Sequence, residues 1–216
     1  MTRKTTHAGL LIVDVQNDFC AGGALAVPGS EQVVSTLSRY IEEAVANDVR
    51  IYASRDWHPA VTRHFKTHGG EWPAHCVQGT DGARFRAALH LSSDAVVITK
   101  GEHPDSPGYS AFEGHTPEGQ SFLADLRERG IEHLYIAGLA TDYCVKHSVL
   151  DALSAGLKVT VLGDAIAGVD ATPGDSARAM VEIREKGAHV VAGAGSLTNA
   201  ATSLAPERFV GLRPPS

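Results

Sequence analysis

Short apolar runs alternate with amphipathic stretches along most of the chain. The runs are rich in β-branched residues and short enough to be strands buried on both faces, and they cover residues 9–15, 49–54, 95–99, 133–139, 157–163 and 188–191. Helical patterns lie between them, near residues 31–47, 119–129, 142–155 and 173–186. Two of these patterns stop at a glycine, Gly130 and Gly187, as helices commonly do. Strand–helix alternation of this kind predicts a parallel sheet with helices on both faces. We therefore expect an α/β fold, a three-layer α/β/α domain over residues 1–216 with a six-stranded, mainly parallel, doubly wound sheet.

One connection breaks this rhythm, between residues 56 and 86. It contains four histidines and both tryptophans of the chain. Long connections inside compact domains are usually either functional or disordered. The aromatic residues and the histidine cluster argue against disorder, so this segment is predicted to be functional.

Composition narrows the class of protein. Hydrophobic residues make up 43% and charged residues 20% of the 216 residues, which suits one α/β domain. The net charge is −6 and the lysines and arginines are scattered, unlike the basic face of a nucleic-acid-binding protein. No apolar run is long enough to span a membrane, and the basic N-terminus leads into an apolar run too short for a signal peptide.

The cysteines indicate the compartment. Three cysteines at wide spacings argue against a disulfide framework and favour the reducing cytoplasm. We therefore expect a cytoplasmic protein that binds neither nucleic acid nor a membrane, and that is either a monomer or a homo-oligomer.

Chemically active residues follow the predicted strands at their carboxyl ends. Asp14, Asp56 and Lys100 follow the first three strands, and Cys144 lies just beyond the fourth. In open α/β sheets the ligand binds outside these ends, where the strand order reverses. Two carboxylates, an amine and a thiol are therefore predicted to share one edge of the sheet.

Cys144 is the candidate nucleophile at this edge. Thr141 can cap the following helix and Asp142 fits its first turn, which places Cys144 near the helix N-terminus. Free N–H groups and the helix dipole there favour a thiolate and can bind an oxyanion. Asp14, at the end of a buried run, is expected to have a raised pKa suited to a general base. Lys100 is expected to orient Asp14 and to favour the thiolate.

Each of these residues also has a structural interpretation. Cys144 can be a buried residue that only fills space, because free cysteine is among the most buried residue types. Asp14 can be a carboxylate bonded to nearby backbone N–H groups, and Lys100 a surface lysine after a strand. Their combination on one edge favours the catalytic interpretation.

The segment between residues 56 and 86 offers a candidate metal site. One carboxylate and three imidazoles suit Fe(II), Mn(II) or Zn(II), and these groups belong to Asp56, His58, His64 and His75. The spacing alone also fits a solvated loop, and only convergence with the catalytic edge favours a metal. His68, flanked by glycine, is left out of the set. His64 is either a fourth ligand or a bystander beside Phe65.

Two aromatic residues lie next to these groups in the sequence. Phe19 follows the first strand and Trp72 belongs to the histidine-rich segment. Aromatic side chains beside a nucleophile and a metal can sandwich a flat ring. Ordinary core packing explains either residue equally well.

Taken together, the motifs resemble the nicotinamidases, also called pyrazinamidases, of the isochorismatase-like cysteine hydrolases. The matching stretches follow one another over most of the chain and read LIVDVQNDFCAGGALAVPG, DWHPAVTRHF, EWPAHCVQGTDGA, GYSAF after Lys100, and GLATDYCV. His64 matches the mycobacterial type of the family. The loop after Lys100 is longer than in that type.

The resemblance implies a role for each site residue. It implies a catalytic triad of Asp14, Lys100 and Cys144. It implies metal ligands at Asp56, His58 and His75, and we predict that His64 is the fourth. It implies an oxyanion hole from the backbone N–H groups of Ala140 and Cys144, and a cis peptide between Ala140 and Thr141. It also implies substrate contacts from Phe19, Trp72, Ala140, Tyr109 and Tyr143.

The implied activity is hydrolysis of nicotinamide to nicotinate and ammonia in NAD salvage, and of pyrazinamide to pyrazinoate. The resemblance implies one divalent metal ion (Zn, Fe or Mn) that binds the ring nitrogen directly or through a water. Asp14 would take the proton of Cys144, whose sulfur would form a thioester that water hydrolyses.

Two other functions stay open. A related amidohydrolase could act on carbamoyl or ureido substrates with the same triad, without needing the metal-binding loop. A binding or scaffold module could keep the fold and lose the chemistry. The intact Asp14, Lys100 and Cys144 argue against the second.

Overall fold

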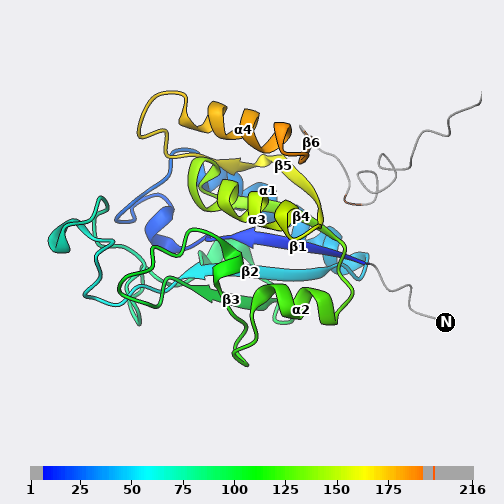
Figure 1. Ribbon diagram of the computed structural model, residues 1–216, viewed down its shortest axis with the longest axis horizontal. Helices are drawn as coiled ribbons and strands as arrows, with labels where there is room; N and C mark the ends of the chain where they lie inside the picture. The colour runs from blue at the N-terminus through cyan, green and yellow to red at the C-terminus, as the bar shows by residue number, and fades with distance from the viewer. Residues whose placement is uncertain (1–6, 192–196, 198–216) are drawn as a thin grey trace, which may run out of the picture.

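Six parallel strands form the centre of the molecule (Figure 1). The computed structural model describes residues 7–191 and Leu197. The strands are β1 (Ala8–Val13), β2 (Arg50–Asp56), β3 (Val96–Lys100), β4 (His133–Leu139), β5 (Lys158–Ala167) and β6 (His189–Val191). They lie in the order β3-β2-β1-β4-β5-β6, and each neighbouring pair is parallel. The predicted fold class is confirmed, with a sheet that is parallel throughout. The prediction of one domain over 1–216 includes residues outside the described part of the chain, and it stays a prediction.

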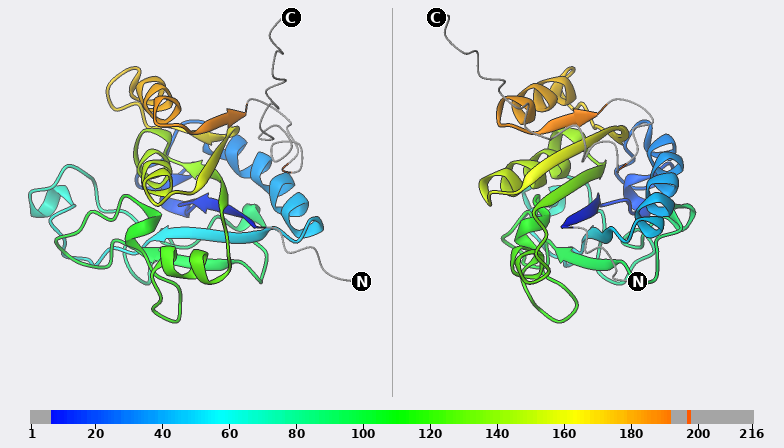
Figure 2. Two further views of the ribbon diagram at one scale, coloured as in Figure 1. Left: turned by 45° about the vertical axis from the view of Figure 1, so that its right-hand side comes forward. Right: turned by 90° about the vertical axis from the view of Figure 1, so that its right-hand side faces the viewer.

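Helices cover both faces of this sheet. They are α1 (Ser30–Ala46), α2 (Phe122–Glu128), α3 (Lys146–Ser154) and α4 (Asp175–Glu185). In the right-hand view of Figure 2, α1 lies on one side of the sheet and the other three helices lie on the opposite side. Single 3-10 turns span Asn17–Phe19, Lys66–His68, Ala87–Leu89 and Ala111–Glu113. Among the described residues, none of the helices combines the length and the apolar character needed to cross a membrane.

Alternation along the strands explains the two cores. In β1, Leu10 and Ile12 pack against the α1 side, and Leu11 and Val13 pack against the side of α2 and α3. All four side chains are fully buried. Successive side chains of a strand point to opposite faces, so a strand covered on both faces must be apolar at every position. This is why β1 is a continuous apolar run in the sequence.

The strand order reverses between β1 and β4. The chain runs from β1 outward through β2 and β3, and then returns to start the other half of the sheet with β4. The connections on the two sides of this point leave in opposite directions, which opens a crevice at the carboxyl ends of β1 and β4. Asp14 follows β1 at this crevice, and residues 140–145 follow β4.

The helix predicted over 142–155 has a different start. Thr141–Val145 form a π-helical turn that continues into α3, and the Val145 N–H donates to the Ala140 carbonyl at 3.1 Å. Ala140 has an extended backbone before this turn, and no side chain caps it. The expectation that Thr141 caps the helix is therefore wrong, because Thr141 is already inside the turn. Asp142 does lie in the first turn, as predicted.

Candidate active site

The side chains predicted at the carboxyl edge meet at the reversal point. Asp14 follows β1, Asp56 and Lys100 end β2 and β3, and Cys144 lies in the π-helical turn after β4. All four side chains are buried. The backbone of Asp14 has a φ of 48°, a left-handed conformation that non-glycine residues seldom adopt. The predicted convergence of these residues on one edge is confirmed.

Lys100 contacts both other members of the predicted triad. Its Nζ lies 2.7 Å from Asp14 Oδ2 and 3.6 Å from Cys144 Sγ. The Ser54 hydroxyl donates to Asp14 Oδ1 at 2.7 Å. The carboxylate is therefore held by an ammonium and a hydroxyl. Lys100 is therefore not a surface lysine, and the side-chain contacts of Asp14 that are described here come from Lys100 and Ser54 and not from backbone N–H groups.

Burial controls the ionisation of this group. It raises the pKa of Asp14, although the Lys100 ammonium counteracts part of the effect. Burial alone lowers the pKa of Lys100, but the two neighbouring carboxylates outweigh it and raise that pKa well above its usual value. Burial also raises the pKa of the Cys144 thiol well above its usual value, more than Lys100 lowers it. The expected preference for a thiolate is therefore wrong for the resting site. The thiol needs a base, and Asp14 is the neighbouring carboxylate with a raised pKa.

Asp56 links this group to the histidine-rich segment. Lys100 Nζ donates to Asp56 Oδ1 at 2.5 Å and to the Gly108 carbonyl at 2.7 Å. Burial disfavours the Asp56 carboxylate, but the Lys100 ammonium favours it, and the net result is a lowered pKa. The buried Gln16 side chain accepts from the Asp56 N–H and donates to the Asp56 carbonyl, both at 2.8 Å. Gln16 lies two positions after Asp14 in the quoted motif, and the sequence carried no signal of its role.

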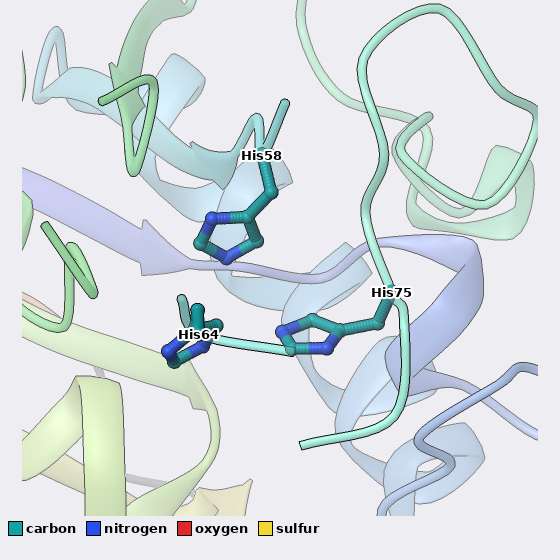
Figure 3. Close-up of side chains that lie close together, drawn as sticks. All are labelled: His58, His64 and His75. Atoms are coloured by element: carbon teal, nitrogen blue, oxygen red, sulfur yellow. The ribbon is translucent and has the colours of Figure 1, made fainter. Parts of the chain in front are cut away.

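Three imidazoles converge on one another (Figure 3). Asp56 lies beside one of them, with its Oδ2 3.5 Å from His58 Nε2. One nitrogen from each of His58, His64 and His75 lies within 4.8 Å of the others. The His58 ring centroid is 4.7 Å from that of His64 and 5.1 Å from that of His75. These residues come from separate turns of the 56–86 segment, and the structure brings them together as predicted. His64 therefore belongs to the cluster, where it also lies against Phe65, with ring centroids 6.2 Å apart.

The histidine cluster has the proton arrangement of a cation site. Nδ1 of His58 is 3.0 Å from the Gly101 carbonyl, and Nδ1 of His75 is 2.7 Å from the Pro73 carbonyl. A carbonyl only accepts, so each Nδ1 carries a proton, and in the neutral tautomer that this assigns each Nε2 keeps a free lone pair. Burial lowers the pKa of His64 to about 4, and it lowers that of His75 too, which keeps both rings neutral.

His58 Nε2 supplies the clearest sign that a cation fits here. It is buried without a hydrogen-bond partner and lies 3.5 Å from Asp56 Oδ2. A lone pair and an ionised oxygen therefore face each other in a buried site, and a divalent cation between such groups satisfies both. The carboxylates and thiol of Asp14, Asp56 and Cys144 also lie within 4.8 Å of one another. The ammonium of Lys100 already provides the positive charge among them.

A cavity joins the histidine cluster to Cys144, because His64, His75 and Cys144 all line it. The aromatic residues expected to contact substrate all line it, namely Phe19, Trp72, Tyr109 and Tyr143. Phe19 packs against His75 with ring centroids 5.4 Å apart, and Trp72 meets Tyr143 edge-on at 4.9 Å. Sequence reasoning did not single out the aliphatic part of the lining, which consists of Leu25, Val27, Leu139 and Val169. The first three lie inside quoted motifs, but Val169 follows β5 and has no sequence signal.

The backbone at Ala140 differs from the expectation in one respect. The cis peptide joins Leu139 to Ala140, so the prediction of a cis bond between Ala140 and Thr141 is wrong by one position. The Ala140 carbonyl accepts from the N–H groups of Tyr143 and Val145, and the Ala140–Thr141 peptide therefore belongs to the helical turn. Ala140 lines the cavity beside Cys144.

Comparison with known proteins shows which family the chain belongs to and which proteins it is similar to. Residues 8–194 match the isochorismatase domain family. The chain is 44% identical over 195 residues to a nicotinamidase of Escherichia coli, which covers 83% of this chain and 92% of that protein. It is 42% identical over 165 residues to a nicotinamidase/pyrazinamidase of Mycobacterium tuberculosis, and the match covers 75% of this chain and 87% of that protein. The crystal structure of a pyrazinamidase of Pyrococcus horikoshii in complex with zinc superimposes with a TM-score of 0.79 at 40% identity, covering 86% of this chain and 99% of that one.

Proposed function

Because this chain belongs to the isochorismatase family, we propose that it is a nicotinamidase, a metal-dependent amidohydrolase that converts nicotinamide to nicotinate and ammonia. One observation carries the proposal. The Lys100 ammonium contacts Asp14 and Asp56 and lies 3.6 Å from the Cys144 sulfur. Cys144 lines one cavity together with Asp56, His64 and His75. A nucleophile and a cation site therefore face the same small volume, and the carboxylate of the base lies within 4.8 Å of the nucleophile.

The cavity suits a flat aromatic carboxamide. Four aromatic side chains line it, and such side chains hold planar rings by stacked or edge-on contacts. The acyl carbon of a bound amide would lie near Cys144, while the ring would extend toward the histidines. Pyrazinamide has the same shape and also carries ring nitrogens, so we propose it as a second substrate.

We assign the metal to Asp56, His58, His64 and His75. The support is the free lone pair of His58 Nε2, the neutral imidazoles and the ionised Asp56 carboxylate. A bound Zn, Fe or Mn ion supplies a Lewis acid to which the ring nitrogen of the substrate can be anchored.

The protein residues carry the bond-making steps. Asp14 takes the proton of Cys144 as the sulfur attacks the amide carbon, because the buried thiol does not ionise by itself. Lys100 stays protonated and keeps Asp14 in place. The N–H groups of Ala140 and Cys144 are the proposed oxyanion hole. Asp14 then returns the proton to the leaving ammonia, and water hydrolyses the thioester to nicotinate.

The two rival functions explain fewer features of the site than a nicotinamidase does. An amidohydrolase acting on carbamoyl or ureido substrates accounts for the triad but not for three converging imidazoles beside an ionised carboxylate. A scaffold module accounts for neither. We further propose that the enzyme acts in the cytoplasm in NAD salvage, as a monomer or homo-oligomer, without binding nucleic acid.

The test is ammonia release from nicotinamide by the purified protein, measured together with its metal content. We expect turnover of nicotinamide and of pyrazinamide, and no turnover in Cys144→Ala with its metal retained. N-carbamoyl amino acids serve as the competing substrates. Turnover of these compounds without turnover of nicotinamide would contradict the proposal, and so would nicotinamide turnover that survives in Cys144→Ala.

A further inference from the structure

The short segment from Gly108 to Ala111 is anchored to the nucleophile region at both ends. Lys100 Nζ donates to the Gly108 carbonyl at 2.7 Å, and the Ala111 N–H donates to the Ser148 hydroxyl at 2.9 Å. Ser148 is fully buried in the first turn of α3. The residue between these anchors that lines the substrate cavity is Tyr109.

His147 packs flat against the ring of Tyr109. The ring centroids are 5.3 Å apart and the planes differ by 18°, which is a stacked pair. His147 is half-buried and lies next to Ser148 in the first turn of α3, one turn after Cys144. Burial lowers the pKa of His147, so the ring that stacks at neutral pH is the uncharged imidazole. The helix that continues from the nucleophile therefore also holds the Tyr109 ring.

Tyr109 in turn positions a residue from the histidine-rich segment. Trp72 Nε1 donates to the Tyr109 hydroxyl at 3.0 Å. Tyr109 also lies against Tyr143, with centroids 6.0 Å apart, and against His64 at 5.7 Å. Trp72 and Tyr109 come from different loops, so this hydrogen bond closes the aromatic wall of the cavity only while Tyr109 keeps its orientation.

We propose that His147 is a specificity-determining positioning residue, which holds Tyr109, and through it Trp72, as a fixed wall for the substrate ring. His147 lies behind Tyr109 and outside the cavity lining. The inference rests on the proposed function for its substrate, an aromatic carboxamide. A fixed wall fits an unsubstituted ring closely. A wall that can move binds that ring less tightly and admits ring-substituted nicotinamides.

The kinetic test compares His147→Ala with His147→Phe, which keeps a stacking ring. For His147→Ala we expect KM for nicotinamide to rise about 2- to 10-fold, the range that an aromatic pair contributes, with kcat changed by less than about 2-fold. The relative kcat/KM for a ring-methylated nicotinamide should increase. His147→Phe should restore both values, and His68→Ala, which removes an exposed histidine of the 56–86 segment, should leave them unchanged.

A second readout does not depend on turnover. Trp57 and Trp72 are the two tryptophans of the chain, so Trp57→Phe leaves Trp72 as the single reporter. In that background, His147→Ala should shift the Trp72 emission to longer wavelength, because Trp72 loses its fixed partner and becomes more solvated. His147→Phe should not shift it. His147→Gln, which is polar and planar without an aromatic ring, is the second variant if His147→Ala does not fold, and it should behave like His147→Ala.

Three results would overturn the inference. The first is wild-type KM and Trp72 emission in His147→Ala or His147→Gln. The second is a fall in kcat with unchanged KM, which would mean that His147 acts on the chemistry through the helix. The third is a His147→Phe protein as impaired as His147→Ala. If the wild-type protein does not turn over nicotinamide, the proposed function fails, and the Trp72 emission still decides whether His147 holds the wall.

Discussion

Lys100 connects the two halves of the site through a single ammonium group. It lies 2.7 Å from an oxygen of Asp14 and 2.5 Å from an oxygen of Asp56, and all three side chains are buried. Two buried carboxylates so close together would repel each other without a cation between them. The lysine therefore favours the ionised form of Asp14 and confines its carboxylate, and it leaves the second oxygen of Asp56 facing His58.

Proton transfer from Cys144 gives the first prediction at this scale. The raised pKa of Cys144 means that iodoacetamide labelling at neutral pH depends on Asp14 as the base. We expect one label, on Cys144, with protection by nicotinamide. Asp14→Asn should slow the labelling strongly and reduce turnover by about 10²–10⁴-fold, the usual contribution of a positioned base. Mass spectrometry of the labelled protein and an ammonia assay measure both effects.

The control for this prediction is Asp151→Asn, an exposed carboxylate on α3. It should keep both the labelling rate and the turnover. Cys20 and Cys76 are fully buried and, unlike Cys144, do not line the cavity, so neither should be labelled in the folded protein. Turnover in Asp14→Asn within a few-fold of wild type would refute the role of Asp14.

The role of His64 is tested by metal content. If His64 is the fourth ligand, His64→Ala should lose metal during mild dialysis against a chelator, and added Mn(II) or Fe(II) should restore part of the activity. His58→Ala should lose metal more completely, because its Nε2 faces Asp56 directly. His68→Ala removes a histidine from the same segment, outside the cluster, and should keep its metal. Full occupancy in His64→Ala beside a stripped His58→Ala would show that His64 is not a ligand.

At the scale of elements, β4 approaches β1 unusually closely at the reversal point. Gly138 has a φ of 117°, and a Cβ there would lie 2.2 Å from the Val13 carbonyl oxygen. The register between β4 and β5 also shifts between Ile136 and Gly138. The end of β4 therefore has its position only because residue 138 has no side chain. Asp14 and the π-helical turn lie directly beyond this contact.

Gly138→Ala tests this close packing. We expect it to lower the free energy of unfolding more than Gly187→Ala, by about 1–3 kcal/mol, the usual cost of overpacking. Gly187 is the matched control because it also has a positive φ, 106°, but no atom lies within 4 Å of the position that an added methyl group would take. Urea unfolding measures both variants. Equal losses in the two proteins would mean that backbone conformation alone accounts for the effect.

At the scale of the whole molecule, the two edges of the sheet have different tasks. The carboxyl edge holds the site, and the opposite edge holds a buried histidine, His133, the first residue of β4. His133 Nε2 lies 2.9 Å from the Thr160 hydroxyl oxygen. Burial lowers the pKa of His133 to about 4, with smaller effects from Lys158 and His189. This group stabilises the fold only in its neutral form.

The sign of the resulting pH dependence is determined by the unfolded chain. Between pH 6.5 and about 4 the unfolded chain binds a proton at residue 133 that the folded protein does not. Stability is therefore lost as the pH falls through this window. The free energy of unfolding should fall between pH 7 and pH 5, and we expect this fall to be smaller in His133→Gln than in the wild type by about 1–2 kcal/mol. Urea unfolding at the two pH values measures it, with the exposed His68→Gln as control. An unchanged loss in His133→Gln would contradict the prediction.

The amino-acid sequence was sufficient to predict the strands, the layers and the edge that carries the site. Strands buried on both faces must be apolar throughout, and the helices between them are amphipathic, so both leave periodic patterns in the chain. Parallel strands place their carboxyl ends on one edge, which is why Asp14, Asp56, Lys100 and Cys144 could be grouped before any distance was known. The functional roles came from the resemblance of the motifs.

The tertiary structure decides which of these groups are in contact and which of them carry a proton. The sharing of Lys100 by two carboxylates depends on the relative positions of three strand ends. The free lone pair of His58 depends on the Gly101 carbonyl, which lies on another loop. Val169 lines the cavity and His147 stacks behind its wall, although nothing in the sequence around either residue indicates this role. Local patterns encode how each segment folds, whereas distances and pKa values arise from the packing of segments that are far apart in the chain.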